Sequence, residues 1–342
     1  MERTRLATAA VLLGWIGLFS SCSSPPPAPA PKDQPAAPKP ITAEERVKWY
    51  QDCWEDFNQK KWTDFQQCYA PTATSQDGMG RTLHGPDAIA ADSENFVKGV
   101  PDVRGDGQLI LVNGTHTAGV YLLTGTNSGP LKSPDGKETP ATNKKFGLLF
   151  GHTLEVEPNA PKGTKEFGVM DNGTFANQLG LSKNPGRPLM EKGVPAPKIV
   201  IAKNDAAETK NLDAEKATAD AWNKRDATTL YPFYADDVVV HDMTQPKDQT
   251  KAQMQQSDKD LWKAFSDARI TNSSIWAAGD YAVINGTFEG TNDGDFAPMK
   301  LKKTGKKVSV PYLSIDRLED GKIKEGWLFF DGAYFAAQLG VK

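Results

Sequence analysis

The spacing of apolar and polar residues predicts helices followed by strands in the last 140 residues of the chain. Asn204 or Asp205 can cap a long helix whose apolar side includes Leu212, Ala219 and Trp222. A second short helix and one β-branched strand follow, then a third helix and four longer strands. The expected elements are helices over 205–222, 227–234, 252–265 and 333–339, and strands over 238–240, 270–278, 281–291, 307–318 and 323–330.

Turn residues join these strands into hairpins. Gly279-Asp280 separates one pair of strands, and Asp320-Gly321 separates another, which is a strong two-residue hairpin signal. Helices first and a meandering sheet afterwards indicate an α+β fold. We expect a strongly curved antiparallel sheet wrapped around the long helix, which leaves a cone with a pocket at its open end.

The same pattern occurs twice along the chain. The segment Asp171–Leu181 returns as Asp331–Val341, and residues 57–129 align without a gap on 222–294, with 14 of 73 positions identical. A repeat this long is a duplicated globular domain, since the repeats of solenoid proteins span about 20–50 residues. We therefore expect two tandem cone-shaped domains, at 41–181 and 204–342, joined by a proline-containing linker at 182–203.

The start of the chain predicts export. Met1–Arg5 is cationic, and Leu6–Phe19 is apolar but shorter than the roughly 20 residues that span a bilayer. Ser20-Ser21-Cys22 resembles the lipobox of bacterial lipoproteins, so residues 1–22 are expected to be a signal peptide and Cys22 a lipidated N-terminus. The alternative is an ordinary secretory signal with an incidental cysteine.

Residues 23–40 hold eight prolines and no large apolar side chain, which predicts an extended tether. We expect an exported protein anchored to the bacterial membrane by lipid. Ser23 after the cysteine resembles the outer-membrane sorting pattern, so the domains would face the periplasm or the cell surface.

Composition excludes some partners. The net charge is −3, with charges scattered along the chain, whereas nucleic-acid binding needs a clustered basic face. The four histidines lie in separate predicted elements without zinc-like spacing. We therefore expect no nucleic acid, no metal and no cofactor, and we leave self-association open.

Cys53 and Cys68 lie at nearly equal distances from the Lys60-Lys61 turn of a predicted helical hairpin. Antiparallel packing would bring them face to face, and export favours a disulfide over two separate buried thiols. Thr218 and Phe233 occupy the matching positions of the second copy, so a bridge would be specific to the first copy.

Three segments carry a family resemblance. Leu230–Asp242 (LYPFYADDVVVHD), Asp320–Trp327 (DGKIKEGW) and the Phe-Asp…Gln-Leu-Gly ending at 330–340 are similar to the SnoaL-like polyketide cyclase family. That family belongs to the superfamily of nuclear-transport-factor-2-like and ketosteroid-isomerase-like folds. The resemblance covers the second copy throughout and the first more loosely, and it implies the cone-shaped α+β fold expected above.

The resemblance also implies site residues on the last strand. Trp327, Phe329 and Asp331 share one face of this strand by alternation, and Asp171 matches Asp331 in the first copy. In the similar families this face points into the pocket, and the terminal aspartate is a general acid/base, whose pKa burial would raise. The alternative is that Asp171 and Asp331 cap the closing helices.

Asp242, matched by Asp77, is the second candidate. It shares a face with Val240, and in ketosteroid-isomerase-like enzymes a carboxylate at this place is the general base. Those enzymes take an oxyanion-stabilising tyrosine from the long helix, where this chain has Thr218 and Cys53. Asp242 is then a catalytic base, a polar group of the pocket or a turn former.

Two functions are compatible with these residues. In the first, the tethered domains bind a small, largely apolar molecule or a partner. In the second, they form a cofactor-free cyclase or isomerase that uses an aspartate on a carbonyl substrate. The second copy is the expected functional one. The catalytic candidates are Asp331 and Asp242, and the ligand-binding candidates are Trp327, Phe329, Val240, Asp171 and Asp77.

Overall fold

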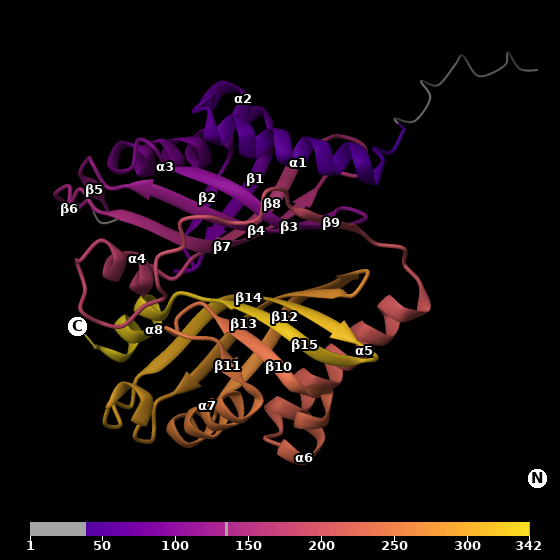
Figure 1. Ribbon diagram of the computed structural model, residues 1–342, viewed down its shortest axis with the longest axis vertical. Helices are drawn as coiled ribbons and strands as arrows, with labels where there is room; N and C mark the ends of the chain where they lie inside the picture. The colour runs from indigo at the N-terminus through magenta and orange to yellow at the C-terminus, as the bar shows by residue number, and fades with distance from the viewer. Residues whose placement is uncertain (1–38, 134–135, 342) are drawn as a thin grey trace, which may run out of the picture. The chain divides into compact units, whose positions relative to one another are not determined.

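The computed structural model describes residues 39–133 and 136–341 (Figure 1). The expected signal peptide, the lipidation at Cys22 and nearly all of the tether lie outside the described residues. Within the part described, no helix is long and apolar enough to cross a membrane.

The first half of the chain begins with helices and ends with a sheet and a closing helix. Thr42 and Glu45 form a capping box at the start of α1, and Gly114 provides the positive φ of the turn between β3 and β4. The elements are α1 (Ala43–Asn58), α2 (Trp62–Gln67), β1 (Tyr69–Asp77), β2 (Thr82–His84), α3 (Pro86–Gly99), β3 (Arg104–Asn113), β4 (His116–Thr126), β5 (Leu131–Lys132), β6 (Glu138–Thr139), β7 (Lys145–Val156), β8 (Gly163–Val169) and α4 (Asn172–Gln178).

The second half repeats this order and confirms the expected elements to within about four residues at each end. Asp205 caps the long helix α5 and is one of the two N-cap residues that the sequence predicted. The elements are α5 (Ala206–Asn223), α6 (Ala227–Leu230), a 3₁₀ turn (Tyr231–Phe233), β10 (Tyr234–Asp242), β11 (Gln249–Thr250), α7 (Lys251–Ala264), β12 (Arg269–Ala278), β13 (Tyr281–Thr291), a 3₁₀ turn (Ala297–Met299), β14 (Lys307–Glu319), β15 (Lys322–Phe329) and α8 (Gly332–Leu339).

The two sheets have the same strand order. The first runs β2-β1-β8-β7-β4-β3-β9 and the second runs β11-β10-β15-β14-β13-β12, so they differ only by the extra strand β9. The expectation of purely antiparallel sheets is wrong at three pairs: β1 with β8 and β3 with β9 in the first sheet, and β10 with β15 in the second, all of which run parallel. Long connections through the later elements separate these strands, so no hairpin forces them to run in opposite directions.

Matching side chains fix matching places in the two halves. Asn58 exchanges two hydrogen bonds with the backbone of Gly105, and Asn223 does the same with Ile270. Asn127 and Asn292 each donate to two carbonyls and each accept from a threonine fifteen and twelve residues later, respectively. These shared bonds confirm that the two halves are copies of one domain.

Each sheet is curved and covered by helices on one face (Figure 1). Register shifts after Gly107 in β3 and after Asn272 in β12 mark bulges at equivalent positions, and bulges bend a strand. On the covered face of the first sheet, Val47 and Tyr50 of α1 pack with Ile110 and other strand residues. We call this face of each sheet its inner face.

The other faces of the two sheets pack against each other. One apolar cluster combines residues of both halves, with Phe329 and Leu313 of the second against Gly151 of the first. A Cβ at Gly151 would lie 2.7 Å from the Phe329 ring, so a side chain there would push the sheets apart. Hydrogen bonds from Asn113 to the Ala277 carbonyl and from Asn285 to Thr153 extend this interface.

The connecting segment is more ordered than the expected linker. Lys198–Ile201 forms β9, which pairs parallel with β3 at the edge of the first sheet. Its β-branched residues could have signalled a strand, but the four prolines of the segment favoured a linker.

The expected disulfide is present. Cys53 of α1 and Cys68, which follows α2, are joined, with 6.0 Å between their Cα atoms. The bridge closes the helical hairpin of the first half, as predicted from the positions of the two cysteines.

Candidate functional site

The Trp327–Phe329–Asp331 face of β15 lies at the interface between the two sheets. Phe329 is fully buried there, and Trp327 packs at the border of the same cluster, stacked on His241 with ring centroids 5.2 Å apart. The three residues do share one face, as alternation predicted. The expectation that this face lines a ligand pocket is wrong, because the other half of the chain covers it.

Asp171 and Asp331 cap the closing helices and link the two halves. Each accepts hydrogen bonds from the first backbone amides of its own helix. Asp331 also accepts from Asn172 Nδ2 at 2.7 Å, and Asp171 accepts from the Gly332 amide at 3.0 Å. Both carboxylates are buried and fully bonded, which favours the capping interpretation over acid–base chemistry.

Asp242 and Asp77 occupy equivalent strand ends and organise the turns that follow. Asp242 accepts from the amide and hydroxyl of Thr244, and burial raises its pKa. Asp77 accepts from two backbone amides and from the Arg81 guanidinium. These contacts favour the role of turn former. Val240 instead packs with the inner-face core of the second half.

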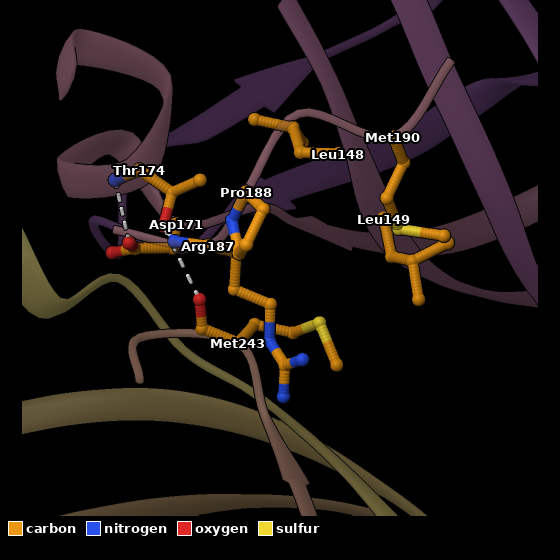
Figure 2. Close-up of a pocket in the computed structure, with 8 residues that line it drawn as sticks. All are labelled: Leu148, Leu149, Asp171, Thr174, Arg187, Pro188, Met190 and Met243. Atoms are coloured by element: carbon orange, nitrogen blue, oxygen red, sulfur yellow. Dashed lines mark hydrogen bonds between the residues drawn. The ribbon is translucent and has the colours of Figure 1, made fainter. Parts of the chain in front are cut away.

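A small cavity lies where α4, the connecting segment and the second half meet (Figure 2). Arg187 runs through it, donating to the Asp242 carbonyl and forming an ion pair with Asp248 at 2.7 Å. The cavity encloses about 10 Å³, and a second one between the sheets, beside Trp276, encloses about 20 Å³. These volumes admit about one water molecule each, so neither is a ligand pocket.

The inner face of the second half carries two carboxylates that no sequence expectation included. Glu215 of α5 is 6% exposed, and its Oε1 atom has no hydrogen-bond partner within the described structure. Asp316 of β14 is half-buried and accepts a hydrogen bond from Ser314 at 2.9 Å. Burial and mutual repulsion raise the pKa of Glu215 well above its usual range, and burial raises that of Asp316 to about 7.

Tyrosines and aliphatic residues surround this pair. Tyr234 and Tyr312 pack against the inner-face core that includes Ala214 and Leu318, and burial, followed by repulsion from the two carboxylates, raises the pKa of both phenols. Tyr312 donates a hydrogen bond to Asn272 Oδ1 at 2.8 Å, so its ring orientation is fixed. Tyr312, Ser314 and Asp316 are all half-buried, and water therefore reaches the pair. We call Glu215, Asp316 and these neighbours the acid-pair site.

The first half holds a different polar group at the same place. Tyr50, which aligns with Glu215, lies 2.5 Å from Nδ1 of His152, and Nε2 of His152 lies 2.5 Å from Glu166. Tyr69 also donates to Glu166. The His152 contact keeps the pKa of Glu166 below its usual value despite burial. This carboxylate already has a basic partner inside the protein.

The carboxylate on the inner face of the sheet lies on a different strand in each half: Glu166 on β8 and Asp316 on β14. In the first half, Leu154 of β7 pairs with Glu166 of β8; in the second, Asp316 of β14 pairs with Gly326 of β15. A Cβ at Gly326 would lie 2.5 Å from Asp316 Oδ1, so Asp316 occupies space beside the glycine. An acid therefore stands on the same strand pair of each inner face.

The interior of the first half is filled by aromatic rings. Trp54 stacks on Tyr121 at a centroid distance of 3.8 Å and also contacts His152. In the aligned sequence, Ala219 replaces Trp54 and Gly286 replaces Tyr121. The Tyr312 ring fills the space beside Gly286, since a Cβ there would lie 2.6 Å from it. The acid of the first inner face is paired with His152, whereas Glu215 Oε1 has no partner within the described residues, so the second inner face is the better candidate for a ligand site.

Two sequence signals could have revealed the pair. Glu215 lies at helical spacing between Leu212, Ala219 and Trp222, so a carboxylate falls on the apolar stripe of the helix. Asp316 alternates with the interface residues Leu313 and Ile315 and must therefore face the helices.

No group of three His, Cys, Asp or Glu side chains suited to a metal ion occurs in residues 39–133 and 136–341.

Comparisons with known proteins agree with the duplicated fold. Residues 212–339 match the family model of the SnoaL-like polyketide cyclases, and residues 50–158 match that of a SnoaL-like domain. Similar solved structures include AclR of Streptomyces galilaeus, with 25% identity over 39% of this chain and 97% of that one, at a TM-score of 0.36. IdmH of Streptomyces antibioticus has 25% identity over 38% of this chain and 99% of that one, at a TM-score of 0.35.

A third similar structure is TsrD of Streptomyces laurentii, with 21% identity over 41% of this chain and 100% of that one, at a TM-score of 0.35. No protein of curated function matches the chain. The family matches fall on the two halves that share one strand order and the same asparagine hydrogen bonds, so the chain is a tandem pair of SnoaL-like domains.

Proposed function

We propose that this protein is an exported, lipid-anchored binding protein whose second SnoaL-like domain holds a small, largely apolar molecule at the acid-pair site. The observation that carries the proposal is the buried Glu215 Oε1 atom without a hydrogen-bond partner. Buried polar atoms in native proteins are nearly always bonded, and an orphaned one indicates a role beyond stability. A ligand with a hydrogen-bond donor would satisfy it.

The surroundings support a ligand with an apolar body. Ile284 and Leu318 belong to the core beside the acid pair, with Val240, Ile275 and Tyr312 partly exposed at its border. Small-molecule sites combine such apolar walls with a few polar groups that orient the ligand. Val240 is the one predicted ligand-binding residue that lies in this region.

The anchor remains a proposal from the sequence. The apolar segment before Cys22 and the proline-rich residues 23–40 support a lipidated tether on a bacterial membrane. Such a tether would hold both domains outside the membrane, where a binding protein meets small molecules from the environment.

A second function, proton transfer on a carbonyl substrate, is favoured by one observation. Burial raises the pKa of Asp316 to about 7, so this carboxylate can exchange a proton near neutral pH. The match to the SnoaL-like polyketide cyclases supports the same chemistry. The acid/base would then be Asp316, in place of Asp331 or Asp242.

A thermal-shift screen of small apolar compounds with hydrogen-bond donors tests the binding function. Compounds that raise the melting temperature of the wild type should lose this effect in Glu215→Gln and keep it in Asp258→Asn. Asp258 is a suitable control because it is a carboxylate of the same domain, bonded to Trp222 and Tyr231, with a pKa raised to about 6 by burial. Equal loss in both variants, or no hits for the wild type, would contradict the proposal.

Proton transfer has a separate readout. Carbonyl compounds among the hits should exchange their α-hydrogens for deuterium in D₂O, as followed by NMR. Asp316→Asn should abolish this exchange, and Asp258→Asn should not. Binding without exchange would leave the protein as a binding module.

A further inference from the structure

We infer that the group recognised at the acid-pair site is a protonated amine, held between the carboxylates of Glu215 and Asp316. The inference rests on the proposed binding function and names the chemical class of its ligand. It starts from the partners of the two carboxylates.

Neither carboxylate has a basic partner. Within residues 39–133 and 136–341, no ion pair involves Glu215 or Asp316, although other acids of the same domain are paired: Asp236 with Lys251 at 2.9 Å and Asp237 with Lys324 at 2.6 Å. In the first half, Glu166 is paired with His152. The acid-pair site thus lacks the counter-ion that its equivalent has, and a cationic ligand would supply it.

Two features favour an ammonium group over a metal ion. Ca²⁺ and Mg²⁺ require about six oxygen ligands, whereas this site offers two carboxylates and the Ser314 hydroxyl. Glu215 Oε1 also lacks a hydrogen-bond donor, and an ammonium group carries three N–H bonds. One of these can reach Glu215 while another reaches Asp316.

The walls suit an organic cation. Tyr234 and Tyr312 pack against the same inner-face core as Ala214, the neighbour of Glu215, and the faces of aromatic rings attract cations. The apolar side chains of Ile275 and Val240 can hold the hydrocarbon part of the ligand.

Release of protons on binding distinguishes an ammonium ligand from a neutral one. Burial raises the pKa of Asp316 to about 7, and burial together with the nearby Asp316 charge raises the pKa of Glu215 well above its usual range, so part of the pair is protonated at neutral pH when the site is empty. A bound ammonium favours the charged carboxylates and so displaces protons into the solvent. A neutral alcohol of the same shape would displace none.

Titration calorimetry on the full chain tests this directly, with 2-phenylethylamine and n-hexylamine as probes and 2-phenylethanol and n-hexanol as matched neutral controls. Measurements at pH 7 in phosphate and in Tris, whose ionisation enthalpies differ, count the protons released. We expect the amines to bind at least tenfold more tightly than the alcohols and to release protons. Glu215→Gln and Asp316→Asn should each weaken amine binding at least tenfold, and Asp258→Asn should change it less than twofold.

The outcomes separate this inference from the proposed function. Alcohols that bind as tightly as amines, without proton release and with sensitivity to Glu215→Gln, would overturn the amine assignment and keep the binding site. Failure of all four probes would also overturn the amine assignment, while the broader thermal-shift screen would decide the binding function. Amine binding unchanged by either site variant would show that the amine binds elsewhere and overturn the inference.

Discussion

The acid-pair site predicts that replacing Asp316 by asparagine stabilises the protein more at high pH than at low pH. Burial raises the pKa of Asp316 from 3.8 to about 7, so the folded protein holds this proton over a pH range in which the unfolded chain has lost it. For a carboxyl group, this makes the folded state most favourable when the group is protonated. That advantage is lost as the pH rises toward the folded-state pKa.

The magnitude follows from proton linkage. Between pH 5 and 7 the folded state binds at most about one more proton than the unfolded chain, so stability falls by at most about 1.4 kcal/mol per pH unit. The ceiling over this range is roughly 2–3 kcal/mol. Because water reaches the half-buried Asp316 and Glu215 shares the proton, we expect the loss of unfolding free energy to be about half of this ceiling, roughly 1–1.5 kcal/mol.

The assay is urea denaturation of the wild type and Asp316→Asn at pH 5, 6, 7 and 8. The difference in unfolding free energy should shift in favour of the variant as the pH rises and level off above pH 7. Asp242 and Asp331, whose pKa values burial also raises, are present in both proteins and cancel in the comparison. Parallel pH profiles, or a variant that becomes relatively less stable at pH 8, would refute the reasoning.

Three further predictions concern the interface, the disulfide and the anchor. Phe329→Ala should lower the unfolding free energy by about 3–5 kcal/mol, since the ring packs against Gly151 of the other domain, and an unchanged denaturation midpoint would contradict the described interface. Replacing Cys53 and Cys68 together by alanine should lower the unfolding free energy by about 3 kcal/mol, because the bridge closes a loop of 15 residues; the wild type treated with reductant should show the same loss. Cys22→Ser should release the protein from the membrane fraction or leave an uncleaved precursor, and unchanged membrane association would exclude the lipid anchor.

The fold was predictable because each half alternates cleanly between helical and strand spacing. The period of two correctly placed Trp327 and Phe329 of β15 on one face, because the register shift of this strand pair lies before Glu325, and the Asp320-Gly321 turn fixed the pairing of β15 with β14. The pattern could not say which face meets the helices, since both faces of β15 are apolar: Ile323 lies in the inner core and Phe329 in the interface. The Trp327 face was therefore assigned to the pocket on family resemblance.

The acid pair was harder to predict because its members lie 101 residues apart, on a helix and on a strand. Each alone is an ordinary charged residue of a surface element. Only the packing of α5 on the inner face, where Ala214 shares a core with Leu318, brings Glu215 near Asp316 and buries the Glu215 side chain. Their role follows from tertiary structure, as does the cross-bonding of Asp171 and Asp331, which joins two turns 160 residues apart.

The sheet-to-sheet interface joins two domains that are parts of one polypeptide. In a dimer of identical subunits, any substitution appears on both sides, so an interior changed to hold a ligand would be changed twice. A covalent connection lifts this symmetry, and it also makes the association of the domains independent of protein concentration. One copy could then retain an aromatic interior and a disulfide, as a rigid support, while the other carries Ala219 and Gly286 in place of Trp54 and Tyr121 and holds the unpaired Glu215. The tandem arrangement thus allows one fold to divide stability and recognition between its two copies.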